Sequence, residues 1–238
     1  MKKLYTILFM FFIISGINAQ PWFDVGIKGG IGSSFMYNKQ IFTDQYLTHV
    51  FKPGYTVGAK LGFNFVQEHQ LTVDVMKTSY TQGFHYYPEA GVEKNREFTI
   101  QGMDYLLMYR LNRNGTYFEI GPQLSTVSKV KYSDEGGDFI SPDKPADVIN
   151  KSYYAVALGF GGYIFGTDNF GVTTGLRLNY TLNDIASDKG HDKNFPVLIA
   201  GDSNPTRNLG IMFIIEMNYD FGYLVSPSCG KRGKLFVF

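Results

Sequence analysis

Residues 170–182 read FGVTTGLRLNYTL, and their alternation is the clearest structural signal in the chain. Apart from Thr174, large apolar side chains fall at every second position from Phe170 to Leu182, whereas small or polar residues such as Gly171 and Arg177 occupy the positions between them. A period of two is typical of a β-strand, because successive side chains of a strand point to opposite faces of its sheet. The stretch therefore predicts a long strand with one apolar and one polar face.

The same alternation recurs in seven other segments. They lie at about residues 22–36, 53–66, 71–77, 101–111, 118–124, 154–164 and 208–221. Two of these predicted strands are imperfect. Lys77 falls on an apolar face, which predicts a bulge or a strand end at that point. Pro122 cannot donate a ladder hydrogen bond, which predicts a local irregularity there.

The connections between the predicted strands alternate in length. Short turns are expected at residues 67–70, 112–115 and 166–169, and long polar loops at residues 37–52, 86–96, 132–150 and 183–206. Short turns at one rim and long loops at the other are typical of bacterial outer-membrane barrels. In lipid every backbone group must be hydrogen-bonded, and strands achieve this only in a closed barrel. The sequence therefore predicts an all-β fold, an eight-stranded antiparallel up-and-down transmembrane β-barrel over residues 20–222.

A soluble barrel is the main alternative, since it also alternates but turns its apolar face inward. Its outer face would then need many Lys and Glu side chains, whereas the polar face here is mostly Gly, Ala, Thr and Asn. Aromatic residues also fall near the predicted strand ends, with Phe23 and Phe65 toward one rim and Phe35 and Tyr180 toward the other. Such rings form the girdles of membrane barrels. These features favour the membrane barrel.

The N-terminus carries an export signal. Lys2 and Lys3 precede an apolar run over residues 4–14, and the small Ala19 closes the segment. This three-part pattern predicts a secretory signal peptide at residues 1–19, because the run is too short to span a bilayer as a helix. The expected mature chain begins at Gln20 and is localised to the outer membrane; an uncleaved anchor is the alternative.

The C-terminus continues beyond the last predicted strand. Pro227, Gly230 and Gly233 supply turn chemistry. Residues 223–238 are therefore predicted to form a short periplasmic tail. The alternative is that residues 234–238 form a further strand segment.

Charge and cysteine content limit the possible functions. The formal charge is +1, and it becomes −1 without Lys2 and Lys3, so nothing indicates nucleic acid as a partner. The single cysteine excludes an internal disulfide framework. The four histidines lack paired metal-ligand spacing, and no phosphate-binding or nucleophile motif is present. We therefore predict no catalytic, cofactor-binding or metal site and no enzymatic activity.

Two weaker signals remain. His85, with Ser79 and Tyr86, is the one arrangement that suits a rim-site enzyme acting on lipid A or peptides. Residues 134–138 and 184–192 are oxygen-rich, but their spacing matches no EF-hand, so we interpret them as solvated loops.

The polar face of the predicted strands carries charges that would point into the lumen. They are Lys28, Lys60, Asp74, Asp104, Arg110, Glu119, Arg177 and Glu216. Buried charges must be paired or hydrated, and side chains fill the interior of an eight-stranded barrel. These residues therefore predict a charge network that plugs the lumen. The alternative is a narrow path for protons, ions or small solutes.

Three glycine-rich stretches resemble a known family. Residues 25–30 (VGIKGG), 158–163 (LGFGGY) and 171–176 (GVTTGL) are similar to strands of the PorT-like outer-membrane barrel proteins of Bacteroidota, which are small OmpA/OmpX-like barrels. The resemblance implies a barrel in the outer membrane, and the family's namesake takes part in type IX protein secretion. The expected partners are outer-membrane lipid or lipopolysaccharide, the barrel-assembly machinery, and proteins that meet the long outer loops.

Overall fold

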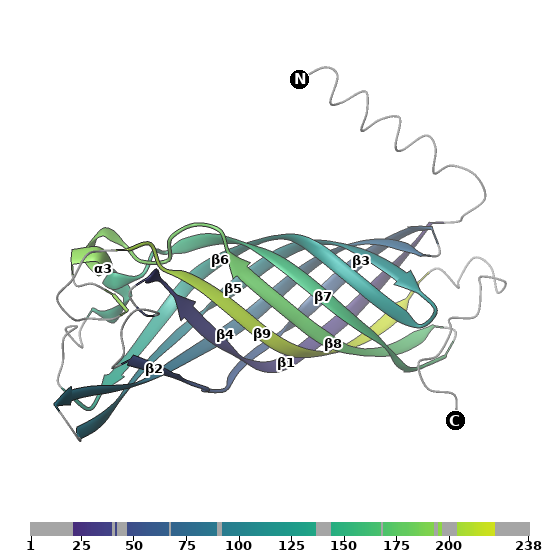
Figure 1. The fold of residues 1–238 in the computed structure, drawn as a ribbon. Helices are drawn as coiled ribbons and strands as arrows, with labels where there is room; N and C mark the ends of the chain where they lie inside the picture. The colour runs from purple at the N-terminus through teal and green to yellow at the C-terminus, as the bar shows by residue number, and fades with distance from the viewer. Residues whose placement is uncertain are drawn as a thin grey trace, which may run out of the picture.

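The computed structural model describes residues 21–39, 41, 47–66, 68–89, 92–136, 144–167, 169–192, 195–196 and 204–221. The predicted signal peptide (residues 1–19) and tail (residues 223–238) lie outside these residues. Most of the described chain forms long strands (Figure 1). The strands are β1 (Trp22–Tyr37), β2 (Leu47–Val50), β3 (Gly54–Val66), β4 (His69–Glu89), β5 (Val92–Arg113), β6 (Thr116–Asp134), β7 (Ser152–Gly166), β8 (Phe170–Thr181) and β9 (Arg207–Asp220). The two short helices are η1 (Pro145–Val148) and α3 (Asp188–Asp192).

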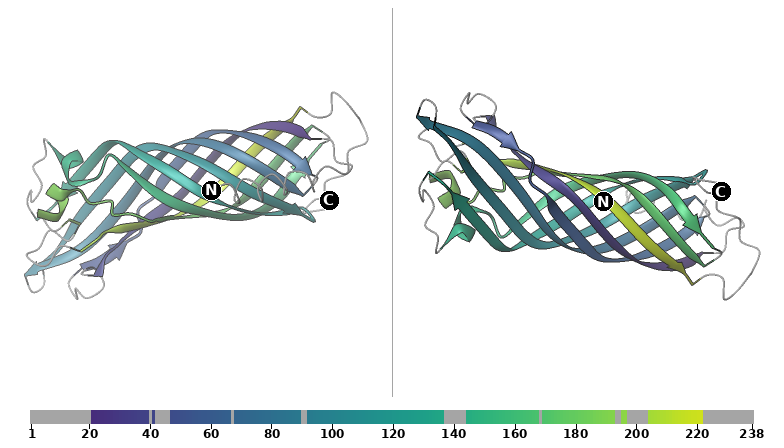
Figure 2. Two further views of the ribbon diagram at one scale, coloured as in Figure 1. Left: turned by 90° about the horizontal axis from the view of Figure 1, so that it is seen from above. Right: turned by 90° about the horizontal axis from the view of Figure 1, so that it is seen from below.

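The sheet closes on itself into a barrel (Figure 2). Each of β1 and β3–β9 pairs antiparallel with the next strand in this series, and β9 returns to pair with β1. The closing pairs include Lys28 with Glu216. This confirms the prediction of an all-β, eight-stranded antiparallel up-and-down barrel. Neither helix in the described residues is long and apolar enough to cross a bilayer.

The tight turn between β5 and β6 shows how the short rim is built. Asn114 and Gly115 link Arg113 to its partner Thr116, and both adopt positive φ values, 49° and 78°. An Asn-Gly pair favours this two-residue hairpin turn, whose twist matches that of the flanking strands.

The loop rim differs from the sequence prediction mainly in two places, and β6 also runs three residues into the expected loop at residues 132–150. Residues 47–50 were expected in a loop, but they form β2, which pairs with β4 beyond the end of β3. Residues 51–53 interrupt this line of pairing, because Pro53 cannot donate a ladder hydrogen bond. Residues 86–96 were also expected to form a long loop, but β4 and β5 run through this region to Glu89 and from Val92. Residues 86–96 include several charged residues and few large apolar ones. The apolar alternation that predicts a strand is therefore missing there.

Of the two irregularities predicted at Lys77 and Pro122, the structure contains one. The pairing of β4 with β3 and β5 keeps its register across Lys77, so the expected bulge or strand end is wrong. Lys77 simply lies on the outer face, exposed, within a continuous strand. At Pro122 the irregularity is confirmed, because the β5–β6 ladder is interrupted between the pairs Leu106–Gln123 and Tyr109–Ile120.

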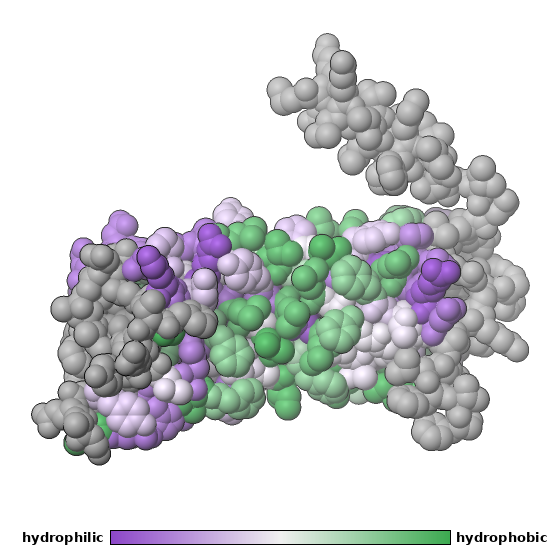
Figure 3. Space-filling model, in the orientation of Figure 1, coloured by the Kyte–Doolittle hydropathy of each residue, from purple (hydrophilic) through white to green (hydrophobic). Residues whose placement is uncertain are grey.

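The wall of the barrel has an apolar outside and a polar inside. Ile27, Ile31 and Phe160 are more than half exposed on the outer face, whereas Lys28 and Glu216 on the inner face are 1% exposed. Figure 3 shows the apolar side chains gathered over the middle of the barrel and hydrophilic ones toward the end that carries α3. This arrangement is the reverse of a soluble barrel, and it places the polar residues at the candidate site.

Candidate functional site: the charged lumen and the cap above it

Glycines on the inner face make room for long charged side chains. Gly159 of β7 pairs with Glu119 of β6 on one side and with Arg177 of β8 on the other. A Cβ atom at Gly159 would lie 2.6 Å from the Cγ and Oε1 atoms of Glu119. Any larger residue would therefore take the space that the two charged side chains need.

Glu216 of β9 is the centre of the charge network. Its carboxylate accepts hydrogen bonds from Arg110 of β5, at 2.8 Å from Nη1 and 2.6 Å from Nη2. The amine of Lys60 lies 2.8 Å from it and the amine of Lys28 lies 3.1 Å from it. One buried carboxylate thus contacts three buried cations, which come from three other strands.

The network continues through two further carboxylates and closes into a ring. Lys28 binds Asp74 at 2.6 Å, and Arg177 binds both Asp74 at 2.9 Å and Glu119 at 2.5 Å. Arg110 then joins Glu119, at 2.7 Å, back to Glu216. The ring therefore alternates between cation and anion all the way round.

Asp24 is part of this network, although the sequence analysis did not include it among the lumen charges. Its carboxylate lies 2.8 Å from the amine of Lys60 and accepts hydrogen bonds from Asn64 and Gln70. With Asp24 the network holds four cations and four anions, so it is formally neutral. In the sequence, Asp24 stands between the apolar residues Phe23 and Val25, and this alternation predicts that its side chain points inward.

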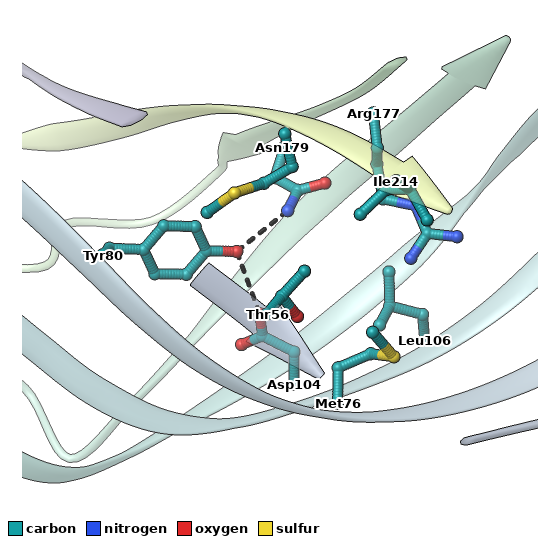
Figure 4. A pocket seen from close by; sticks show the side chains of 9 residues that line it. Thr56, Met76, Tyr80, Asp104, Leu106, Arg177, Asn179 and Ile214 are labelled. Carbon is teal, nitrogen blue, oxygen red and sulfur yellow. Dashed lines mark hydrogen bonds between the residues drawn. The ribbon is translucent and has the colours of Figure 1, made fainter. Parts of the chain in front are cut away.

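Asp104 is the one predicted lumen charge that the structure does not bring into the network. Within the described residues no Lys or Arg nitrogen lies within 4.0 Å of its carboxylate. It instead accepts hydrogen bonds from the hydroxyls of Thr78 at 2.8 Å and Tyr80 at 2.9 Å. Tyr80 in turn accepts one from Asn179 at 2.9 Å (Figure 4).

A small cavity lies beside this second cluster. Its volume is about 10 Å³, and its walls include Tyr80, Asp104 and Arg177 together with Met76, Leu106 and Ile214 (Figure 4). This is about the space of one water molecule. The Oδ1 atom of Asn179, which also lines the cavity, is buried and has no protein partner. The lumen at this level therefore has room for one water and no larger ligand.

Above the polar lumen an apolar cluster closes the end of the barrel that carries the long loops. Phe84 and Phe98 from the β4–β5 hairpin pack there with Phe195, Ile185 and Val148 from the loops. The loop segments are tied down by polar contacts, since Asp184 accepts hydrogen bonds from two backbone N–H groups at 2.9 Å and binds His191 at 2.8 Å. We call these loop residues and the apolar cluster the cap.

Asp134, at the end of β6, anchors the rim of the cap. Burial opposes its charged form, but hydrogen bonds from the hydroxyls of Tyr132 and Tyr86, from the N–H of Gly136 and the charge of Arg96 outweigh that effect. The pKa of Asp134 therefore lies below its ordinary value.

This shift predicts a pH dependence of the rim. Because the pKa of Asp134 is depressed in the folded protein, its stabilising effect is complete above the unfolded value of about 3.9 and is lost as the pH falls through the lower folded value. We expect D134N to remove this dependence and to speed amide exchange at residues 132–136 about tenfold at neutral pH. Hydrogen exchange with mass spectrometry, carried out at several pH values, measures both the exchange rate and its pH dependence. Unchanged exchange in the variant would contradict the anchoring role.

The residues suggested for a rim-site enzyme do not form one cluster. Ser79 and His85 lie six positions apart on β4, which separates them by about 20 Å. His85 contacts Glu93 instead, and the hydroxyl of Tyr86 is bound to Asp134 on the opposite face of the strand. Within the described ranges no group of three His, Cys, Asp or Glu side chains is placed to hold a metal ion.

Comparisons with known proteins give general likeness only. No protein-family model matches the chain, and no curated protein is similar to it in sequence. Among solved structures, the outer membrane protein OprG of Pseudomonas aeruginosa is 10% identical, with a TM-score of 0.41, over 87% of this chain and 98% of its own. Neisserial surface protein A is 10% identical, with a TM-score of 0.38, over 83% and 98%. Ail, the attachment invasion locus protein of Yersinia pestis, is 11% identical, with a TM-score of 0.35, over 82% and 98%. These values are too low to transfer any role, so the function is argued from the barrel itself.

Proposed function

We propose that this protein is an integral outer-membrane β-barrel with a structural, interaction or secretion-supporting role and no catalytic activity. The observation that carries the proposal is the outer wall of the barrel. Residues such as Ile27 (63% exposed), Ile31 (67%) and Leu61 (52%) form a continuous apolar surface. Soluble monomers rarely expose apolar patches larger than a few hundred Å², whereas a lipid-facing wall requires them.

Aromatic side chains support the same proposal. Near the short-turn rim, the rings of Phe23 and Phe63 lie 5.1 Å apart on the outer face. Toward the loop rim, Tyr55 and Tyr154 are 45% and 63% exposed. Two such girdles mark the edges of an apolar band about 25 Å tall in known membrane barrels. By the usual orientation of these barrels, the short turns would face the periplasm and the cap the outside.

The location is testable by fractionation and gel migration. We expect the full chain to fractionate with outer membranes and to migrate faster on a gel when unheated than after boiling, because closed barrels resist detergent at room temperature. A protein that stays soluble without detergent would overturn the proposal.

The lumen is expected to be closed to ions. The charge network and the cap fill it, and the cavity between them holds about one water. In planar bilayers the purified protein should give no steady stepped conductance, and vesicles that contain it should not swell in an isosmotic small sugar. Reproducible conductance steps would favour the alternative of a narrow channel.

The finer parts of the proposal rest on the sequence. They are the signal peptide at residues 1–19, the PorT-like kinship and its link to type IX secretion, and contacts with the barrel-assembly machinery, lipopolysaccharide and partners of the outer loops. A deletion strain tests the secretion link, since loss of type IX cargo from the culture medium would support it and normal export would count against it. Unchanged lipid A in the same strain, measured by mass spectrometry, would support a non-catalytic role.

A further inference from the structure

The outer wall is hollowed where β5 and β6 lose their ladder hydrogen bonds. Pro122 lacks an N–H group, and the β5–β6 pairing is interrupted beside it. A groove of about 290 Å³ opens on the outside at this point. Its lining includes Val73, Tyr105, Leu107, Pro122, Leu124 and Tyr154. The groove lies on the apolar wall, so an apolar chain is the chemistry it fits.

A cluster of three lysines lies beyond the same part of the wall, toward the loop rim. Lys129 and Lys131 are exposed on the outer face of β6, because the intervening Val130 is buried inside the barrel. Lys151 is also exposed, and its carbonyl accepts a hydrogen bond from Val127 N–H at 2.8 Å, which places its backbone next to this part of β6. We call these three residues the lysine cluster.

The positive charge of the lysine cluster is largely uncompensated. No carboxylate of the described residues lies within 4.0 Å of these three amines. Asp147 lies in the field of Lys151, but it is paired with Lys189 at 2.9 Å. The cluster is therefore free to bind an external anion such as a phosphate group.

The geometry points to a binding site for a phosphorylated glycolipid of the lipid A type. One acyl chain would lie in the groove between Tyr105 and Tyr154, and a phosphate would bind the lysine cluster. Leu124 and Lys129 pair with Tyr105 and Gln101 across a bulge in β6, which places them about 14 Å apart along the sheet. This spacing suits a lipid that joins an acyl chain to a phosphorylated sugar. We choose an outer-leaflet lipid because the cluster lies at the loop rim. This inference rests on the proposed membrane location.

Binding is tested with the full chain, purified in detergent and titrated with lipid A while native mass spectrometry counts bound lipid. We expect saturable binding of one lipid A molecule. The variant K129Q/K131Q/K151Q should bind it about a hundredfold more weakly. The matched variant K52Q/K94Q/R207Q removes the same charge from other parts of the loop rim and should bind within about twofold of the parent. Equal loss in both variants would overturn the site, because it would show a nonspecific charge effect.

Two further arms test each half of the site. L124W fills the groove on a lipid-exposed face without touching the lysines, and it should weaken lipid A binding about tenfold. Lipid A without its phosphates should bind the parent as weakly as lipid A binds the lysine variant. Equal affinity for phosphatidylglycerol would overturn the choice of lipid A. Absence of binding in a protein that still fractionates with outer membranes and shifts on heating would refute this inference alone.

Discussion

Replacing Glu216 by alanine is expected to destabilise the barrel more than any other single change to a charge in the lumen. The carboxylate of Glu216 contacts Lys28, Lys60 and Arg110 at 2.6–3.1 Å, and all four side chains are buried. A buried charge that loses its partner costs about 3–5 kcal/mol. In E216A each of three cations keeps one other carboxylate, but the formerly neutral network is left with one uncompensated positive charge. We therefore expect E216A to lose at least about 3–5 kcal/mol of unfolding free energy, measured by urea unfolding in lipid vesicles.

A conservative and a distant variant sharpen this test. E216Q keeps the shape and part of the hydrogen bonding but not the charge, so it should fall between E216A and the parent. E97Q breaks the pair of Glu97 with Lys52, whose side chains are 40% and 38% exposed, and it should cost less than about 1 kcal/mol. If E216A matched E97Q, the network would have no special role in stability.

The second large effect is expected from adding a side chain inside the barrel at Gly159. G159L would place its Cβ atom 2.6 Å from Glu119 and drive the rest of the side chain between Glu119 and Arg177. Overpacking costs about 1–3 kcal/mol, and a broken buried pair adds about 3–5 kcal/mol. We expect the variant to refold poorly and to lose the faster migration of the unheated protein on a gel.

Gly29 provides the matched control, because it is also a glycine in the middle of a strand. A Cβ atom there would meet nothing within 4 Å, so G29L should refold and lie within about 1 kcal/mol of the parent. Equal tolerance of both substitutions would mean that the lumen is looser than the distances in the structure indicate.

Much of the barrel was predictable because the membrane wall imposes a strict alternation on the sequence. Residues 170–182 show it most clearly, and residues 170–181 form β8. The alternation fades where the strands rise above the apolar wall, as in β2 and in the upper part of the β4–β5 hairpin. There the remaining apolar side chains, such as Phe84 and Phe98, point inward to the cap, so the outward alternation that marks the lower wall is missing.

The site was predictable in composition but not in arrangement. Alternation indicates that Asp104 and Asp74 both face inward, but their heights in the barrel depend on the stagger between neighbouring strands. That stagger places Asp74 among the cations and Asp104 beside Tyr80 and Thr78. It also brings Asp24, from the first strand, within reach of Lys60. The groove and the lysine cluster combine residues from different strands, so alternation within one strand does not reveal them.

The position of Glu216 on β9 has a consequence for the order of folding. Its three cations lie on β1, β3 and β5, all of which precede β9 in the chain. Until β9 pairs with β1, a partly formed sheet carries these cations without their shared counter-charge. Seam closure and charge neutralisation therefore happen in one event, which makes half-closed intermediates costly and the last step of folding cooperative.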